Sequence, residues 1–270
     1  QPGMHPLRDL LARTLLETGR PDDGAAVFRE VEAQATGDFQ LLAMMARFYH
    51  RAKRGGDAER CLLRMRQLDP SHAPTYSELA QLYIDYAQYS KASEVSRDGL
   101  RLDPNSTVFW NTLANCQSSI GLVDEALVSY RKVLELAPNT PPSHSNLLLT
   151  MHYVSGLDPA EIFEEHKRFG RVHAPPALAT RDFPNTPEPA RRLRIGYVSP
   201  DIRQHSVAFF LEPLLDHRDR DRFEVYGYGA VKTPDEVTQR LRGKFDQYRN
   251  VFDMTMPHMA QTIKADRIDI

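Results

Sequence analysis

The 270-residue sequence has little of several features that mark particular protein classes. Its two cysteines, Cys61 and Cys116, are far apart and show no CxxC or Cys/His spacing, so neither a disulfide framework nor a zinc site is predicted. No apolar run approaches the roughly 18 residues that span a bilayer, and the opening QPGMHPL lacks the basic and apolar regions of a signal peptide. A net charge of −2 gives no electrostatic reason to expect binding to nucleic acid or to a membrane. We therefore expect a cytoplasmic protein in a reducing compartment.

Proline, in contrast, recurs at a fixed spacing. Pro70, Pro104 and Pro138 are 34 residues apart, and each follows an apolar helix end, in QLDP, RLDP and ELAP. This period is typical of the tetratricopeptide repeat, a helix pair that buries its apolar face only by stacking on neighbouring pairs. The sequence predicts an α-solenoid of such repeats over residues 1–140. Aligned on the prolines, the repeats start at about His5, Phe39, Ala73, Thr107 and Pro141.

The packing positions of the repeat are filled as the motif requires. Small residues are predicted where the second helix crosses the first, at Ala58, Ala92 and Ala126. Gly19 and Gly121 fall in the turn between the helices, where a positive φ is needed. The aromatic residues are interpreted as core residues: Tyr76, Tyr83 and Trp110.

Polar residues of the first helices would line the concave face of the solenoid. They form two columns, Glu78, Thr112 and Asn146 in one and Gln81 and Asn115 in the other. An Asn side chain offers both a donor and an acceptor, so such a column could hold the backbone of an extended peptide. We predict Asn115 and Asn146 as peptide-binding residues, with a solvated helix face as the alternative.

The repeat pattern then gives way to a connection. Residues 141–173 are predicted as linker helices that form a partial fifth repeat, the second helix opening with Asp158 as N-cap and Pro159 at the first helical position. Residues 174–192 contain five prolines, which exclude a helix or a central strand, and are predicted as an extended strap.

From Leu193 onward, strands and helices are expected to alternate. The pattern predicts strands over 193–199, 223–231 and 248–253 and the start of a fourth at Ile268, with a helix for which Ser206 is the expected N-cap after the first strand. This alternation favours a parallel sheet with helices on both faces, so residues 193–270 are interpreted as a truncated Rossmann-like lobe.

In such sheets ligands bind beyond the carboxyl ends of the strands, which directs attention to the loop PDIRQH. No GxGxxG, Walker or GxSxG motif is present, which disfavours a dinucleotide, a P-loop nucleotide and a doubly wound hydrolase. The loop ends with His205 at the start of a helix. His205 could donate a hydrogen bond to a phosphate or carboxylate, or take a proton from a hydroxyl.

The segment LRIGYVSPDIRQHSVAFFLEPLLDHRDRDRFEVYGYG resembles the opening of the catalytic region of the protein O-GlcNAc transferases and their SPINDLY-like relatives. The preceding NLLLTMHYVSGLDPAEIFEEHKRFG resembles their linker helices. The resemblance implies two Rossmann-like lobes that carry out inverting transfer of a sugar from UDP-GlcNAc to Ser or Thr of acceptor proteins, which the repeats recruit. It implies His205 and Asp266 as catalytic residues. It also implies substrate contacts from the loop, at Ser199, Pro200, Asp201 and Ser206.

The sequence departs from this family because it stops at Ile270, within a predicted strand and before the second lobe. We expect these 270 residues alone to be inactive, because the second lobe stabilises the leaving diphosphate in the family. No cofactor or metal is expected beyond the donor substrate. Two alternatives stay open: a protein O-fucosyltransferase that uses GDP-fucose, and a non-catalytic tetratricopeptide interaction scaffold.

Overall fold

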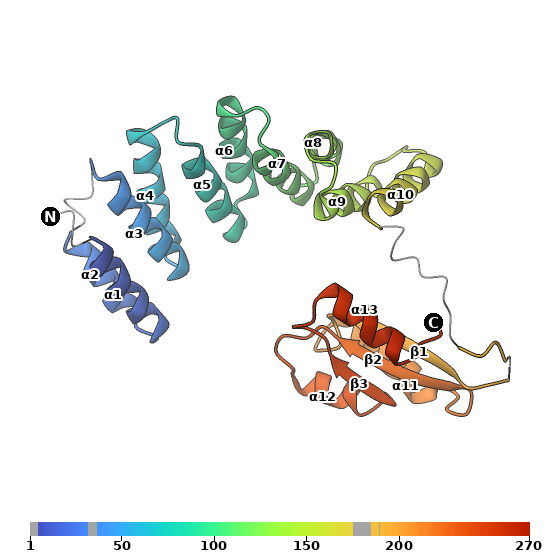
Figure 1. Cartoon of the computed structure of the whole chain (residues 1–270). Helices are drawn as coiled ribbons and strands as arrows, with labels where there is room; N and C mark the ends of the chain where they lie inside the picture. Colours follow the sequence, from blue (N-terminus) through green and yellow to red (C-terminus); the bar gives the residue numbers. More distant parts are fainter. Residues whose placement is uncertain (1–4, 32–36, 175–184, 189) are drawn as a thin grey trace. The chain divides into compact units, whose positions relative to one another are not determined.

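The computed structural model describes residues 5–31, 37–174, 185–188 and 190–270. The chain divides into two compact units, residues 1–178 and 179–270 (Figure 1). We call them the solenoid unit and the α/β unit. Most of the predicted strap over 174–192 lies outside the described residues.

The solenoid unit is built from helix pairs, and each pair packs against the next pair along the chain. The first helices begin at the residues that the 34-residue spacing predicted, which confirms the repeat. They are α1 (His5–Glu17), α3 (Phe39–Arg51), α5 (Ala73–Asp85), α7 (Thr107–Ser119) and α9 (Pro141–Met151). Their partners are α2 (Pro21–Arg29), α4 (Gly55–Leu68), α6 (Tyr89–Leu102), α8 (Val123–Leu136) and α10 (Pro159–His173).

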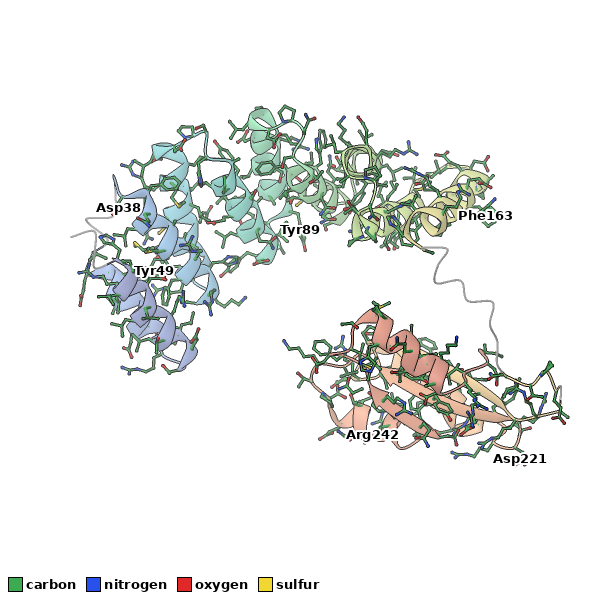
Figure 2. The ribbon with its side chains drawn as sticks, viewed as in Figure 1. Asp38, Tyr49, Tyr89, Phe163, Asp221 and Arg242 are labelled. Atoms are coloured by element: carbon green, nitrogen blue, oxygen red, sulfur yellow. The ribbon has the colours of Figure 1, made fainter. Side chains whose placement is uncertain are left out.

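Local capping explains where several of these helices begin. Asp38, at the start of α3 (Figure 2), accepts a hydrogen bond from the backbone N–H of Leu41 at 3.0 Å. Asp158 caps α10 as predicted, accepting from the backbone N–H of Ala160 at 2.9 Å, with Pro159 at the first helical position. The side chain thus satisfies an N–H that has no partner within the helix.

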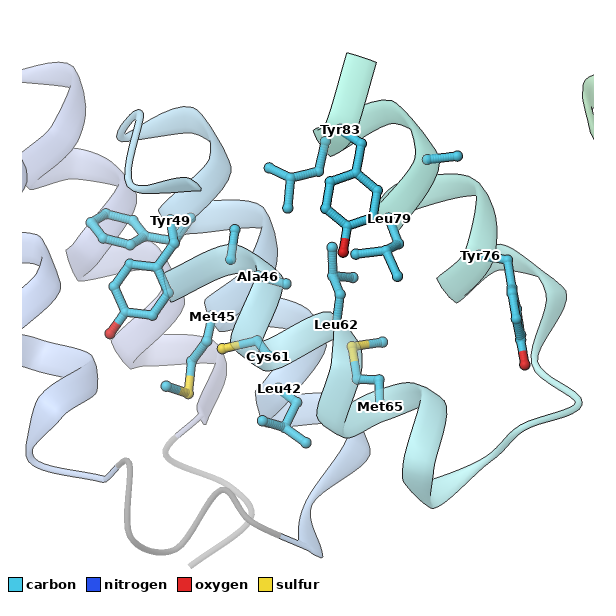
Figure 3. Close-up of a cluster of buried hydrophobic side chains, with 14 of the residues drawn as sticks. Leu42, Met45, Ala46, Tyr49, Cys61, Leu62, Met65, Tyr76, Leu79 and Tyr83 are labelled. Carbon is cyan, nitrogen blue, oxygen red and sulfur yellow. The ribbon is translucent and has the colours of Figure 1, made fainter. Parts of the chain in front are cut away.

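The core of the solenoid lies between successive helices and holds the predicted apolar and small residues. Figure 3 shows one cluster, in which Leu62 and Met65 of α4 pack with Leu79 of α5. Cys61 and Cys116 are buried and form no disulfide with each other, in agreement with the sequence. Trp110 corrects the core prediction, because it is only half-buried and its indole N–H donates to the carbonyl of Pro104 at 2.8 Å.

The α/β unit contains a parallel sheet in the order β1-β2-β3, which confirms the predicted α/β arrangement. The strands are β1 (Leu193–Ser199), β2 (Phe223–Gly229) and β3 (Gln247–Asn250), and the helices are α11 (Ser206–His217), α12 (Glu236–Arg242) and α13 (Met256–Ala265). Val225 packs with residues of α11 and α12, and its neighbour Tyr226 packs with residues of α13. Helices therefore cover both faces of the sheet (Figure 1).

The predicted fourth strand is present only as a short extended segment. Gly196 donates its backbone N–H to the carbonyl of Ile270 at 2.9 Å, and Asp269 donates to the carbonyl of Arg194 at 2.9 Å. Residues 268–270 therefore run along the edge of β1 that β2 leaves free. Within the described residues, no helix is long and apolar enough to cross a membrane.

Candidate active site

The loop after β1 is held in place by hydrogen bonds and by one buried side chain. Ser199 Oγ accepts the backbone N–H of Asp201 at 3.0 Å, and Ile202 is fully buried beneath the loop. The backbone N–H of Gln204 donates to Asp235 Oδ2 at 2.8 Å. Asp235 also caps α12, and these N–H donors hold the pKa of its carboxyl below the usual value. The loop is thus tied to a second helix rather than free in solvent.

His205, and not Ser206, is the N-cap of α11. Its ring nitrogen Nδ1 accepts the backbone N–H of Val207 at 3.2 Å, whereas Ser206 is the first helical residue and is exposed. A backbone N–H can only donate, so Nδ1 must carry a lone pair, and the proton of the neutral ring is on Nε2. Nε2 lies 3.9 Å from Asp201 Oδ1, and the side chains of His205 and Asp201 are 38% and 27% exposed. His205 therefore presents an N–H donor to solvent beside a carboxylate.

An open pocket of about 350 Å³ lies beyond the carboxyl ends of all three strands. It is lined by the loop at Pro200 and Arg203, by the residues after β2 and by Phe252 after β3. Arg203 and Lys232 give the pocket a cationic lining, which suits an anionic group such as a phosphate. Sequence reasoning missed Arg203, Lys232 and Thr233, although they follow the carboxyl ends of predicted strands. It also missed Phe252, which it placed inside the third strand and which in the structure follows β3.

Asp266 lies elsewhere in the unit. It ends α13, directly before the segment that pairs with the start of β1, whereas His205 follows the end of β1. Its carboxylate accepts from Arg249 Nε and Nη2 at 2.8 and 2.6 Å and from the Tyr228 hydroxyl at 2.7 Å. The Arg249 guanidinium holds the pKa of Asp266 below its usual value. Among the described residues, no hydrogen bond or ion pair joins Asp266 to His205.

The two predicted peptide-binding asparagines do come together in the solenoid unit. Asn115 Oδ1 accepts from Asn146 Nδ2 at 3.2 Å and from the Tyr130 hydroxyl at 2.6 Å. Both asparagines are half-buried, so the pair is anchored from below and still accessible. Asn115 Nδ2 and Asn146 Oδ1 take no part in these bonds and are oriented by them.

Glu78 and Gln81, which belong to the two predicted columns of polar residues, line a pocket of about 150 Å³ between α3 and α5, two repeats before the Asn115–Asn146 pair. Arg47, Glu78 and Gln81 surround an apolar floor of Ala46 and Leu62. Gln81 donates to Asp85 at 2.8 Å. Among the described residues, no group of three or more His, Cys, Asp or Glu side chains gathers as a metal site would require.

Known proteins share both parts of this arrangement. A family profile described as "Tetratricopeptide repeat" matches residues 108–140. A probable UDP-N-acetylglucosamine–peptide N-acetylglucosaminyltransferase, SPINDLY, from Arabidopsis thaliana is 34% identical over 145 residues, which cover 50% of this chain. Its counterpart from Solanum lycopersicum is 30% identical over 141 residues, or 51% of this chain. A mutant of the Thermobaculum terrenum O-GlcNAc transferase superposes over 87% of this chain, with a TM-score of 0.64 and 33% identity.

The chain resembles the O-GlcNAc transferase and SPINDLY-like family. It spans 15% of the length of these two SPINDLY relatives and 45% of the T. terrenum chain. The crystal structure of MamA protein, at 16% identity and a TM-score of 0.54 over 63% of this chain, shares the fold alone. This chain is thus similar in sequence to relatives named as transferases. Similarity of the solenoid fold alone does not indicate a function.

Proposed function

We propose that this chain is part of a protein O-linked N-acetylglucosaminyltransferase, which moves the sugar of UDP-GlcNAc to Ser or Thr hydroxyls of acceptor proteins. The observation that carries the proposal is the position of His205, at the carboxyl end of a parallel sheet and on the loop that lines a cationic pocket at Pro200 and Arg203. The similarity to SPINDLY and to the T. terrenum enzyme supports glycosyl transfer as the reaction class.

In this proposal the α/β unit is the first part of a Rossmann-like lobe. With residues 268–270 on the free edge of β1, the strand order runs from that segment through β1 and β2 to β3. One half of a doubly wound sheet has this order, and its ligand crevice opens beside the first strand. The loop that carries His205 follows that strand.

The proposed reaction is a displacement at the anomeric carbon. The acceptor oxygen bonds to that carbon on one face while the bond to the diphosphate breaks on the other, which inverts the configuration. Because Nδ1 of His205 accepts the hydrogen bond of the helix cap, His205 contacts the substrates as a hydrogen-bond donor, through Nε2–H. The neighbouring Asp201 carboxylate accepts the proton of the acceptor hydroxyl. Arg203 and Lys232 supply part of the positive charge that stabilises the leaving diphosphate, and the second lobe supplies the rest.

The solenoid unit recruits the acceptor protein in this proposal. The coupled Asn115–Asn146 pair offers one free donor and one free acceptor to a peptide backbone. The pocket between α3 and α5 offers charged side chains of both signs around an apolar floor. These groups bind an extended segment mainly through its backbone, so many acceptor sequences are compatible.

The test separates the chemistry of His205 from its structural role. Asn is among the preferred N-caps, so His205→Asn keeps the cap, whereas His205→Ala removes it and costs about 0.5–2 kcal/mol of stability. In a polypeptide of the relatives' length that contains this chain, His205→Asn lowers the rate of labelled GlcNAc transfer about a hundredfold or more, with folding unchanged. His217→Asn, the same substitution at the other end of α11, leaves the rate unchanged.

Transfer by His205→Asn at the wild-type rate contradicts the proposed role of His205. Incorporation of labelled fucose from GDP-fucose, in place of GlcNAc, identifies the fucosyltransferase alternative. Binding of acceptor proteins without transfer from either donor identifies the scaffold. The 270 residues alone are expected to bind acceptor peptides and not to turn over donor.

A further inference from the structure

A second polar pocket lies at the other end of the sheet, where β1 begins. It has a volume of about 230 Å³, and four of its lining residues are arginines: Arg191, Arg192, Arg194 and Arg267, together with Asn185 and Thr186. The pocket is formed wholly within the α/β unit. A cluster of four guanidinium groups is unexpected in a chain whose net charge is −2, because like charges repel each other unless something compensates them.

One arginine is used to hold the pocket together. Arg191 forms two hydrogen bonds to the carboxylate of Asp269 and donates through Nε to the carbonyl of Thr186 at 2.7 Å. Asp269 is 8% exposed, and Arg191 holds the pKa of its carboxyl far below the usual value. This pair remains ionised at neutral pH and fixes the wall of the pocket.

The other arginines keep hydrogen-bond donors for a ligand. Arg194 donates through Nε to Glu224 at 2.9 Å and through Nη1 to the carbonyl of Asp266 at 3.0 Å, which leaves Nη2. Arg192 donates through Nη2 to the carbonyl of Phe223 at 3.3 Å. Within the described residues, the guanidinium of Arg267 makes no hydrogen bond or ion pair.

The backbone at Arg267 is held in an unusual conformation. Its φ is +52°, in the left-handed region that non-glycine residues seldom adopt, and Asn185 donates to its carbonyl at 3.0 Å. Glycine is the usual residue at this position after a helix. The arginine therefore occupies a place where glycine would be more stable, which is consistent with a role for its side chain.

The carboxylates near the pocket interact with arginines other than Arg267, and Asp269 and then Glu188 raise the pKa of Arg191. Asp269 is occupied by Arg191, and Glu224 by Arg194. Asp246 lies 3.6 Å from Arg192 but only 3.0 Å from the buried Arg218, so it is shared between two cations. Among the described residues, no carboxylate forms an ion pair with Arg267, and Arg192 shares Asp246 with Arg218.

We propose that this pocket binds a phosphate monoester dianion. Guanidinium groups hold phosphate oxygens through paired, charge-assisted hydrogen bonds, and three guanidiniums with free N–H groups match the several acceptor oxygens of a phosphate better than the two of a carboxylate. The phosphate group is either that of a small metabolite or nucleotide, or that of a phosphorylated Ser or Thr side chain. The site does not depend on the proposed glycosyl transfer.

The experiment uses the 270-residue chain and calorimetric titration with inorganic phosphate, followed by a nucleoside monophosphate and a phosphoserine peptide. Arg267→Gly removes the guanidinium and relieves the positive φ, so this variant folds at least as stably as wild type. It binds phosphate about tenfold more weakly, as expected for the loss of one charge-assisted contact. Arg220→Gln, which removes an exposed arginine outside the pocket, leaves the affinity unchanged.

Tighter binding of the nucleotide or of the peptide than of inorganic phosphate identifies the source of the phosphate group, and binding of all three alike also supports the site. The proposal is overturned if phosphate shows no saturable binding, if Arg267→Gly binds it as wild type does, or if Arg220→Gln weakens binding equally. Loss of glycosyl transfer in the longer polypeptide has no bearing on this result.

Discussion

At the residue scale, the turns inside the repeats share one backbone conformation despite different side chains. Gly19, Lys53, Ala87 and Gly121 are each 34 residues apart and have φ values of +77°, +60°, +55° and +80°. Only glycine adopts this region without steric cost. The conformation is therefore imposed by the packing of the two helices, and the non-glycine turns carry strain that the rest of the repeat offsets.

This strain predicts opposite effects for opposite substitutions. Ala87→Gly should raise the free energy of unfolding by about 0.5–1 kcal/mol, because it relieves a left-handed alanine at some entropic cost. Gly121→Ala should lower it by about 1 kcal/mol, since nothing crowds the added methyl group and only the backbone conformation opposes it. Urea unfolding followed by the fluorescence of the single Trp110 measures both values. Changes of the same sign in both variants would contradict the argument.

The N-cap of α11 shows what residue preferences cannot resolve. Ser is a preferred N-cap, and the sequence therefore favours Ser206 over its neighbour. The structure uses His205 instead, because its ring nitrogen reaches the N–H of Val207 while its backbone is still extended. Which of two adjacent polar residues becomes the N-cap depends on the direction from which the loop enters the helix. Buried Ile202 and the hydrogen bond between Gln204 and Asp235 determine that direction, and it cannot be read from the local sequence.

At the element scale, a buried histidine attaches α10 to α9. His144 is 1% exposed and lies between Glu165, at 2.9 Å from its Nε2, and His173, at 2.9 Å from its Nδ1. Arg168 also contacts Glu165. With Glu165 as acceptor, the neutral ring of His144 satisfies both bonds. Nδ1 of His173 is then a buried atom with no hydrogen-bond partner in the described structure.

This arrangement predicts a loss of stability in mild acid. Burial lowers the pKa of His144 in the folded state, against a smaller opposing effect from Glu165. Below its ordinary pKa of about 6.5 the unfolded chain takes up a proton that the folded chain resists, so stability is complete above that pH and falls as the pH drops towards 5. The slope for one proton is at most about 1.4 kcal/mol per pH unit.

Urea midpoints between pH 7.5 and 5.5, followed by Trp110 fluorescence, measure this slope. His144→Gln keeps a donor for Glu165 and an acceptor for His173 but does not titrate, so its midpoint should vary less with pH than that of wild type. Equal slopes in the two proteins would assign the acid sensitivity to other groups.

The same scale gives Asp266 a structural role that can be measured. Its carboxylate is 12% exposed and joins α13 to Arg249 of β3 and Tyr228 of β2. Asp266→Asn should destabilise the α/β unit by about 1–3 kcal/mol, because the buried Tyr228 and the partly exposed Arg249 lose a charged acceptor. The lowered pKa of the carboxyl means that its contribution is present above about pH 4 and is lost as the pH falls further.

Hydrogen exchange of the β1–β3 amides measures this effect without interference from the solenoid. Asp253→Asn is the control, since Asp253 is exposed on the loop before α13. Wild-type protection in Asp266→Asn would show that the contacts are dispensable. A catalytic role would then be the simpler explanation for the family resemblance at this residue.

Helices and strands could be predicted from the sequence best where residues close in the chain determine their bounds. The first helices of the repeats start where the proline spacing predicted, because each proline follows the end of the preceding helix and stops that helix from continuing. β1 also has its predicted bounds, whereas β3 is shorter and begins earlier than the strand predicted over 248–253. The length of β3 depends on its register with β2, which pairs only Tyr226 to Gly229 with it. The register between strands depends on tertiary contacts, so the local sequence pattern predicts it poorly.

At the scale of the whole molecule, the solenoid core is not uniform. One cluster of buried side chains extends from Ala12 to Cys116, and a second extends from Ala114 to Met151. Both involve α7, which contributes Phe109 and Cys116 to the first cluster and Ala114 to the second. In a repeat array, stability is the sum of single repeats and the interfaces between neighbours. The interface between α6 and α7 therefore connects the first three repeats to the rest.

Gly99 of α6 lies in this interface at a position that has no room for a larger side chain. A Cβ atom at Gly99 would lie 2.5 Å from the ring of Phe109, a side chain that is 2% exposed and has little room to move. Gly99→Ala should therefore cost about 1–2 kcal/mol, as overpacking of 1–3 kcal/mol exceeds the gain in helix propensity of up to about 1 kcal/mol. Gly170→Ala in α10, where nothing lies within 4 Å, should instead stabilise by about 0.5–1 kcal/mol.

The two substitutions are chemically identical, so their difference isolates the contact with Phe109. If the α6–α7 interface couples the two clusters, Gly99→Ala should also broaden the urea transition and lower its m value, because the repeats on either side then unfold less cooperatively. Trp110 on α7 reports the change at the interface itself, and circular dichroism reports all helices together. A uniform shift of one sharp transition by both probes would mean that the array stays a single cooperative unit despite the weakened contact.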